Sequence, residues 1–237
     1  SICSCRGPIR RTGTSTGCLN SIGAGGGGTG LIGGEVLRLG LKNGHEIMTV
    51  GRRPTGMASS EIVSSFDDLP QLPPADIAIC ALGTTIRQAG TQAAFRAIDE
   101  EAVVSFAKAA KAAGVDHFLV VTAVGANPDA SVFYSRVKGQ TEGQLMKMGF
   151  KRLDIIRPGL LLGDRKERRP IEVLLQHIAP ATDLLMHRKW RRYRSVQAAD
   201  AAQCLLELAA NNEPGVYTLH FDDIMKVLQS PSQDVTR

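Results

Sequence analysis

The chain has 237 residues, 43% of them hydrophobic, which is enough for one substantial core and predicts a single domain. No apolar run approaches the ~20 residues that a membrane-spanning helix needs, and none follows Arg6, Arg10 and Arg11 in the manner of a secretory signal peptide. The formal net charge of +5 is modest. These features predict a soluble, cytoplasmic protein with no membrane contact.

The cysteines and histidines argue against a disulfide framework and a metal site. The cysteines are odd in number and show no CxxC spacing, and no two histidines lie at HxxxH spacing. We therefore expect a reducing compartment and no bound metal. The residues concerned are Cys3, Cys5, Cys18, Cys80 and Cys204, with His45, His117, His177, His187 and His220.

Residues 1–20 are rich in Gly, Ser, Thr, Arg and Cys and offer few apolar anchors. We expect them to form a poorly ordered or non-native leader. The rest, residues 21–237, is expected to fold as one domain, with residues 160–237 forming its substrate-side part.

The run "GAGGGGTGLIGG", residues 23–34, has the composition of a flexible linker and the spacing of a phosphate-binding loop. The triplet Gly23, Gly25 and Gly28 satisfies GxGxxG, but more glycine follows it instead of a helix. The triplet Gly27, Gly30 and Gly33 is better placed, because it leads directly into an amphipathic segment whose first amides can meet a pyrophosphate. From the loop alone, the two interpretations are about equal.

From residue 31 onward, helical patterns alternate with short apolar runs, as in a parallel sheet with crossover helices. We therefore predict an α/β fold with a doubly wound parallel sheet. The apolar runs bounded by turn residues predict strands at 45–50, 76–83, 117–125, 153–159 and 215–221. The amphipathic segments predict helices at 31–44, 99–114, 133–148, 170–179 and 197–212.

The stretch "VGRRP" stands about 20 residues beyond the glycine loop, where a Rossmann unit selects its cofactor. No acid is present there to accept a ribose 2′-hydroxyl. Arg52 and Arg53 are instead suited to hold a 2′-phosphate through charge-assisted hydrogen bonds. The stretch therefore favours NADP over NAD, although two surface arginines in a turn would look the same.

The stretch "YSRVK" places Tyr134 and Lys138 one helical turn apart. Helical phase puts both on the arc of Val137, Thr141, Leu145 and Met148, and puts Arg136, Gly139 and Glu142 elsewhere. A lysine on an apolar face needs a partner, which is either a carboxylate or the combination of a cofactor ribose and the phenol. We expect Lys138 to lower the pKa of Tyr134 and to prepare it for acid–base chemistry.

These motifs, together with "CALGTT", "FLVVTAVGA" and "RPGLLLGDR", resemble the atypical short-chain dehydrogenase/reductases, closest to the oxidoreductases related to the human Tat-interactive protein. The resemblance covers residues 27 to about 221 and implies an NAD(P)-binding Rossmann domain. It implies that Tyr134 is the proton relay, that Lys138 holds the nicotinamide ribose, and that Thr122 polarises the substrate carbonyl. Thr122-Ala123 stands where relatives often have paired serines. The implied cofactor-binding residues are Gly27, Thr29, Gly30, Leu31, Ile32, Gly33, Arg52, Arg53, Gly83, Thr84, Lys138, Pro158 and Gly159.

The preferred function is an NADP-dependent oxidoreductase that moves a hydride to or from a carbonyl carbon, with a small carbonyl or alcohol substrate. One alternative is an NADPH-binding sensor that acts through a protein partner, and another is a nucleotide-sugar epimerase or dehydratase. The basic stretches "DRKERR" and "HRKWRRYR" lack the aromatic interleaving of a nucleic-acid surface, so no nucleic-acid partner is expected. A homodimer or a regulatory protein partner is left open.

Overall fold

The computed structural model describes residues 22–25, 28–163 and 188–230. The expected leader at 1–20, the expected helix at 170–179, the stretch "DRKERR" and Gly27 lie outside these residues.

The described chain forms a seven-stranded sheet in the order β3-β2-β1-β4-β5-β6-β9. Every neighbouring pair is parallel, and the order reverses direction between β1 and β4, so the predicted doubly wound sheet is confirmed. The strands are β1 (Ile22–Gly25), β2 (Ile47–Gly51), β3 (Ser60–Val63), β4 (Ile77–Cys80), β5 (His117–Val121), β6 (Arg152–Ile156) and β9 (Gly215–Leu219).

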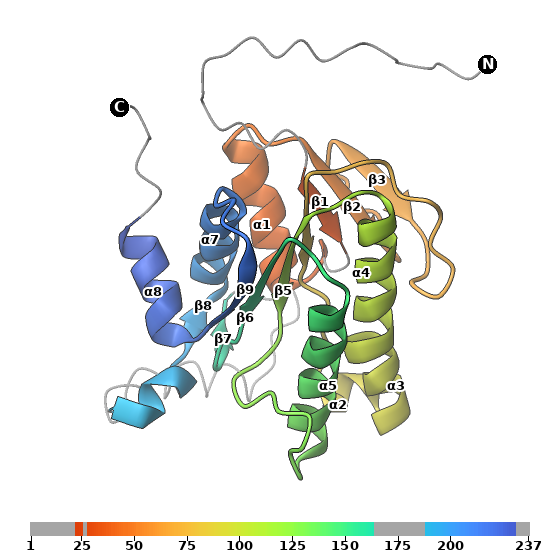
Figure 1. Ribbon diagram of the computed structural model, residues 1–237. Helices are drawn as coiled ribbons and strands as arrows, with labels where there is room; N and C mark the ends of the chain where they lie inside the picture. The colour runs from red at the N-terminus through yellow and green to blue at the C-terminus, as the bar shows by residue number, and fades with distance from the viewer. Residues whose placement is uncertain (1–21, 26–27, 164–187, 231–237) are drawn as a thin grey trace, which may run out of the picture.

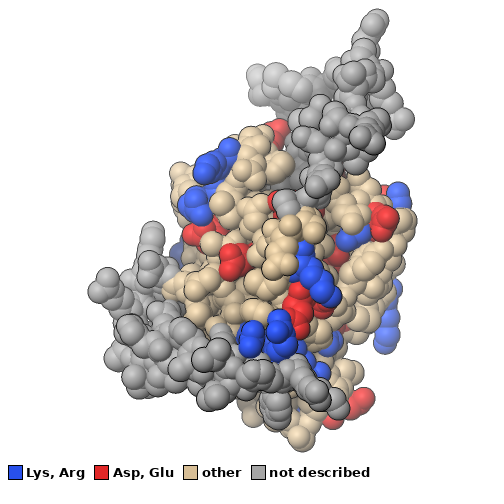
Figure 2. Space-filling view, turned by 90° about the vertical axis from the view of Figure 1, so that its left-hand side faces the viewer, with Lys and Arg blue, Asp and Glu red and all other residues tan. Residues whose placement is uncertain are grey.

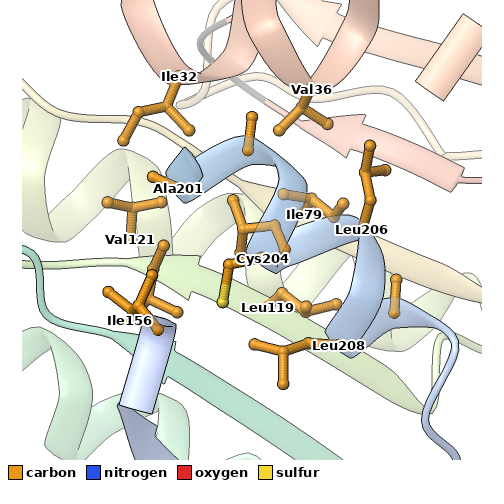
Figure 3. Close-up of a cluster of buried hydrophobic side chains, with 14 of the residues drawn as sticks. Ile32, Val36, Ile79, Leu119, Val121, Ile156, Ala201, Cys204, Leu206 and Leu208 are labelled. Atoms are coloured by element: carbon orange, nitrogen blue, oxygen red, sulfur yellow. The ribbon is translucent and has the colours of Figure 1, made fainter. Parts of the chain in front are cut away.

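Helices cover both faces of this sheet (Figure 1). One face carries α1 (Leu31–Lys42), α7 (Ala198–Ala209) and α8 (Phe221–Gln229), and the other carries α4 (Val103–Ala112) and α5 (Phe133–Lys147). All five residues of β5 and all five of β6 are buried, as expected of parallel strands between two helical layers. Figure 3 shows the hydrophobic core on the face that carries α1, α7 and α8, where α7 lies between α1 and the apolar side chains of the central strands.

The predicted strands and the long helices within the described residues are confirmed, with ends shifted by a few residues. Among the described residues, the sequence did not predict several short or late elements. These are β1, β3, α2 (Ile86–Ala89), α3 (Gln92–Arg96), the two-stranded pair β7 (Leu161–Leu162) and β8 (Val196–Gln197), η2 (Arg188–Tyr193) and α8. Strands of two to four residues carry too little periodicity to be recognised.

The expected helix at 99–114 is part of a longer helical path with a π-helical segment, η1 (Ala97–Ala102), between α3 and α4. A π-turn widens the helix locally and changes which residues face the protein interior. Here Asp99 is fully buried within that segment.

The buried arc of α5 is wider than predicted. Gly139 and Glu142, expected to lie away from the interior, are both buried. A Cβ on Gly139 would lie 2.2 Å from the backbone carbon of Asn127, because the loop that follows β5 passes against this flank of the helix. Helical phase does not reveal this contact, because the loop belongs to a different part of the chain.

At the amino ends of β5 and β6, a buried ionic cluster joins neighbouring strands. Asp154 lies 2.6 Å from His117 Nε2 and accepts two hydrogen bonds from Arg152, and the guanidinium of Arg152 lies 4.4 Å from the ring centroid of Tyr217 on β9. The cluster fixes the register of β5, β6 and β9 at the edge of the sheet opposite to the one that carries the candidate site.

Candidate functional site

The N-terminus of α1 opens at the carboxyl edge of the sheet, immediately after β1. Gly30 is the N-cap, no side chain caps the helix, and the first turn contains no acid. By contrast, Thr85 and Thr91 cap α2 and α3 by accepting from backbone amides. The first-turn amides of α1 and its helix dipole are therefore suited to receive an anion such as a pyrophosphate.

The register of the glycine run is resolved by β1. Gly23 and Gly25 lie within the strand, paired with β2 on one side and β4 on the other, so that triplet does not lead into the helix. Gly30 caps α1, and Gly33 is buried in its first turn. The second register therefore has the predicted strand–turn–helix setting.

Arg52 and Arg53 follow Gly51, the last residue of β2, and both side chains are exposed. Val50 near the end of β2 is in register with Gly25 at the end of β1, so the two arginines follow the strand that lies beside the glycine loop. A 2′-phosphate on the adenine ribose is the group that would meet this position in a Rossmann fold.

Tyr134 and Lys138 lie in the first half of α5, as predicted. The Tyr134 ring packs against Phe95 of α3, with ring centroids 5.4 Å apart and planes tilted by 44°. Tyr134 is half-buried, while Lys138 is only 4% exposed. The predicted pair therefore has one partly exposed member and one held in the interior.

Lys138 has the buried carboxylate partner that the sequence left open. Its Nζ lies 2.7 Å from Asp99 Oδ1, and Asp99 Oδ2 accepts the backbone N–H of Thr84 at 2.9 Å. Asp99 lies in the helix expected at 99–114, but sequence reasoning did not identify it as the partner of Lys138. Its spacing from Phe95 and Val103, four residues to either side, was the available signal that it faces the interior.

The pKa of Tyr134 is raised overall, because burial outweighs the lowering by Lys138 that the sequence predicted. Burial raises the pKa of the phenol, the Lys138 ammonium opposes the rise, and the Asp99 carboxylate adds to it. Burial would lower the pKa of Lys138, but Asp99 and Tyr134 outweigh burial, and the pKa of Lys138 is raised. Burial likewise raises the pKa of Asp99, against the opposing effect of Lys138.

Thr122 follows β5 and is buried, and its hydroxyl has a partner within the protein. Thr122 Oγ1 donates to Glu142 Oε1 at 2.6 Å, and Glu142 also accepts two hydrogen bonds from Arg157. A hydroxyl has one proton to donate. Polarising a substrate carbonyl, the role implied for Thr122, would therefore require the bond to Glu142 to be broken.

Gly83 and Thr84 follow β4 and lie beside the Lys138–Asp99 pair. A Cβ on Gly83 would lie 3.4 Å from Asp99 Oδ1 and 3.7 Å from Lys138 Nζ, so this loop and the end of the lysine side chain are in contact. The predicted positions Gly83, Thr84 and Lys138 are thus brought together.

Pro158 and Gly159 follow β6. Pro158 is buried, and its carbonyl accepts the N–H of Val124 at 3.0 Å. A Cβ on Gly159 would lie 2.4 Å from the carbonyl oxygen of Arg194, so the glycine is required by backbone packing. This contact explains the residue without a cofactor.

The basic stretch "HRKWRRYR" forms η2 up to Tyr193 and packs near the start of α8. Arg191 pairs with Asp222 at 2.7 Å, and the guanidinium of Arg194 lies 5.9 Å from the ring centroid of Phe221. Figure 2 shows basic and acidic side chains lying next to one another on this side of the molecule. These contacts give the described part of the stretch a role in local structure.

The arrangement fits a dinucleotide. The uncapped α1 N-terminus would hold the pyrophosphate, Arg52 and Arg53 the adenine ribose, and the loop at Gly83 and Thr84 would lie along the cofactor. Among the described residues, no group of three or more His, Cys, Asp and Glu side chains is placed to hold a metal, and no helix is long and apolar enough to span a membrane.

The fold and the edge of the sheet define a Rossmann domain of the nicotinamide-dinucleotide type. No protein-family model matches the chain. A mitochondrial FMP52 protein of Coccidioides immitis is 30% identical over 198 residues, covering 75% of this chain and 80% of the relative. A second mitochondrial relative, fmp52-1 of Aspergillus terreus, is 30% identical over 222 residues, covering 84% and 95%. HTATIP2 of Rattus norvegicus is 37% identical over 135 residues, which span 55% of each chain.

Solved structures agree on the fold. MoeE5 in complex with UDP-glucose and NAD has a TM-score of 0.65 at 14% identity, covering 90% of this chain and 82% of that one. The human epimerase family protein SDR39U1 with NADPH has a TM-score of 0.60 at 21% identity, covering 84% and 74%. The chain belongs to the atypical short-chain dehydrogenase/reductases, in the group that contains FMP52 and HTATIP2.

The relatives contradict the expected cytoplasmic localisation, because the fungal FMP52 proteins are named as mitochondrial. The expectation rested on the missing apolar segment. Mitochondrial transit sequences do not contain one, since they are amphipathic, rich in Arg and Ser and poor in acids. The absence of an apolar segment therefore does not exclude a mitochondrial protein.

Proposed function

We propose that the protein is an NADP-dependent oxidoreductase that acts on a carbonyl or alcohol substrate. The observation that carries the proposal is the placement of Tyr134 and Lys138 on α5 at the same sheet edge as the uncapped N-terminus of α1. This combination brings an acid–base group and an anion-binding helix end to one side of a parallel sheet.

Each residue has a defined part. Tyr134 donates its hydroxyl proton to the carbonyl oxygen, which breaks the O–H bond, and the tyrosinate then regains a proton from water. NADPH, when bound, supplies the hydride that the carbonyl carbon receives. Lys138 stays charged beside the phenol, and Arg52 with Arg53 selects the phosphorylated cofactor.

Two measurements test this function. NADPH and NADH are titrated against the protein by calorimetry, and a panel of aldehydes and ketones is then screened for NADPH oxidation. Tyr134→Phe keeps the ring that packs on Phe95, so NADPH affinity and melting temperature should change little. Turnover should fall by about 10²–10⁴, which is what a positioned acid–base group contributes. An active substrate that the variant converts at the original rate would remove Tyr134 from the mechanism.

One observation favours a second candidate, an NADPH-binding sensor that acts through a protein partner. Lys138 and Thr122, two of the three expected catalytic residues, are already held by Asp99 and Glu142. A sensor needs the dinucleotide site and not the chemistry. Tight NADPH binding without turnover on any substrate of the panel favours this candidate.

A nucleotide-sugar epimerase or dehydratase is the less favoured alternative. MoeE5, whose solved complex contains UDP-glucose and NAD, shares the fold. We keep a small carbonyl or alcohol compound as the preferred substrate. Proton exchange at a UDP-sugar without net NADPH consumption would favour the epimerase.

A further inference from the structure

Asp99 joins the loop after β4 to two residues of α5. Its Oδ1 pairs with Lys138 Nζ at 2.7 Å, and its Oδ2 accepts the Thr84 amide at 2.9 Å. Its backbone carbonyl accepts the Thr141 hydroxyl at 3.0 Å. The π-helical turn of η1 carries this carboxylate in the interior, where its exposure is 0%.

Asp99 also belongs to the helical path that positions Tyr134. Phe95, one turn earlier, packs on the Tyr134 ring, so the same path contacts the phenol and the ammonium of Lys138. The charged or titratable groups that act on one another here are Lys138 and Tyr134 from α5, Asp99 from η1 and Cys80 from β4. Glu100, the next acid in η1, pairs with Arg96 instead.

The buried ammonium of Lys138 and carboxylate of Asp99 together carry no net charge. An isolated Lys138 ammonium would attract the proton out of the Tyr134 hydroxyl, because an opposite charge favours the phenolate. With the Asp99 carboxylate at 2.7 Å from the ammonium, the phenol meets an ion pair instead of a net positive charge. Burial is then the main influence on the ionisation of the Tyr134 hydroxyl, and burial favours the neutral phenol.

We propose that Asp99 is a positioning residue that neutralises Lys138 and keeps the Tyr134 hydroxyl protonated, which suits the site to proton donation in carbonyl reduction rather than to alcohol oxidation. The inference rests on the proposed function for the direction of reaction. The charge arrangement itself does not depend on a substrate.

The test is a tyrosinate titration by near-ultraviolet absorbance, without cofactor or substrate. The chain has three tyrosines, and subtracting the curve of Tyr134→Phe from that of the starting protein isolates Tyr134. The Tyr134 signal should appear only above the ordinary tyrosine pKa of about 10. In Asp99→Asn, which removes the charge and keeps the shape, the signal should move to lower pH. Each substituted protein is paired with its own Tyr134→Phe double variant for the subtraction.

Glu100→Gln is the matched control, because it removes an equal charge from the same helical turn and leaves Lys138 paired. Its Tyr134 signal should not move. The proposal is overturned when Tyr134 in the starting protein ionises below the ordinary range, or when a folded Asp99→Asn titrates as the starting protein does. The first of these outcomes is measured on the starting protein, so it can overturn the proposal even when Asp99→Asn does not fold.

The result separates this inference from the proposed function. A titration as expected, in a protein that converts no carbonyl compound, supports the charge arrangement and removes the oxidoreductase. Turnover in the reducing direction with a Tyr134 that ionises early keeps the oxidoreductase and removes the role of Asp99.

Discussion

At the scale of single residues, the Lys138–Asp99 pair places two charges where water does not reach, with exposures of 4% and 0%. Removing one member of such a pair leaves an uncompensated buried charge, which costs about 3–5 kcal/mol. Replacing both members by groups of similar shape without charge is often neutral. The pair therefore couples stability to the candidate chemistry.

A double-mutant cycle measures that coupling. Asp99→Asn and Lys138→Met should each lower the free energy of unfolding by about 3–5 kcal/mol, because each leaves the partner charge unpaired. The double variant should lose clearly less than the sum of the two. Denaturant unfolding of the four proteins gives the values, and additive losses would mean that the two side chains do not interact.

The preference for NADPH over NADH also depends on single residues. Arg52→Glu with Arg53→Glu should weaken NADPH binding by at least about tenfold, or 1.4 kcal/mol, and change NADH binding less, because NADH lacks the 2′-phosphate. Lys42→Glu is the control, since Lys42 is exposed in the last turn of α1, at the end away from the glycine loop. Calorimetry measures the affinities. Equal affinities for NADPH and NADH in the starting protein would contradict the assignment.

At the scale of elements, α5 contains two glycines with opposite surroundings. A Cβ on Gly139 would lie 2.2 Å from the Asn127–Pro128 backbone, whereas one on Gly143 would meet nothing within 4 Å. Both are helical positions, so both substitutions improve the intrinsic helix propensity equally. Packing alone distinguishes the two sites.

Gly139→Ala should therefore destabilise the protein by about 1–3 kcal/mol or more, because the methyl group meets backbone that cannot turn aside. Gly143→Ala should stabilise it by up to about 1 kcal/mol. Denaturant midpoints of the two variants provide the comparison. A Gly139→Ala protein as stable as Gly143→Ala would mean that the loop after β5 does not pack against α5 as described.

The elements that sequence reasoning predicted are those whose pattern is local. The buried strands are continuous apolar runs, and α5 and α7 are long periodic segments, so each could be recognised without its neighbours. Tyr134 and Lys138 were found because a helix places them one turn apart. Asp99 was missed because its partner Lys138 comes from another element, which the pattern of its own helix does not reveal. The wider buried face of α5 was missed because it packs against the loop after β5, which the pattern of the helix alone does not reveal.

At the scale of the whole molecule, the amino and carboxyl edges of the sheet carry different groups of charged side chains. The amino edge holds Asp154 with Arg152 and His117, a cluster that joins strands. The carboxyl edge holds Lys138 and Asp99 beside the loop after β4, and the exposed Arg52 and Arg53 follow β2 at the same edge. The molecule thus separates a purely structural ionic cluster from the groups to which we assign function.

The distribution of surface charge gives a prediction for the whole molecule. Because the exposed Arg191 is paired with Asp222, and basic and acidic side chains adjoin on that face, binding to DNA or RNA should be weak near physiological salt (Figure 2). Fluorescence anisotropy with a labelled duplex and a single strand, repeated over a range of salt, tests this. Tight binding with a steep salt slope would show a phosphate-binding surface and favour the regulatory function.

The composition of β1 has a consequence for local opening of the native state. Glycine, which has no side chain to pack, occupies two of the four positions of this strand, and the strand pairs with β2 on one side and β4 on the other. We expect a strand half made of glycine to open transiently at a lower free energy than β5, all of whose residues are buried. A ligand bound over the adjoining glycine loop would add its binding energy to that segment. The amides of the strand beside the proposed dinucleotide site should therefore gain protection from hydrogen exchange when the cofactor binds.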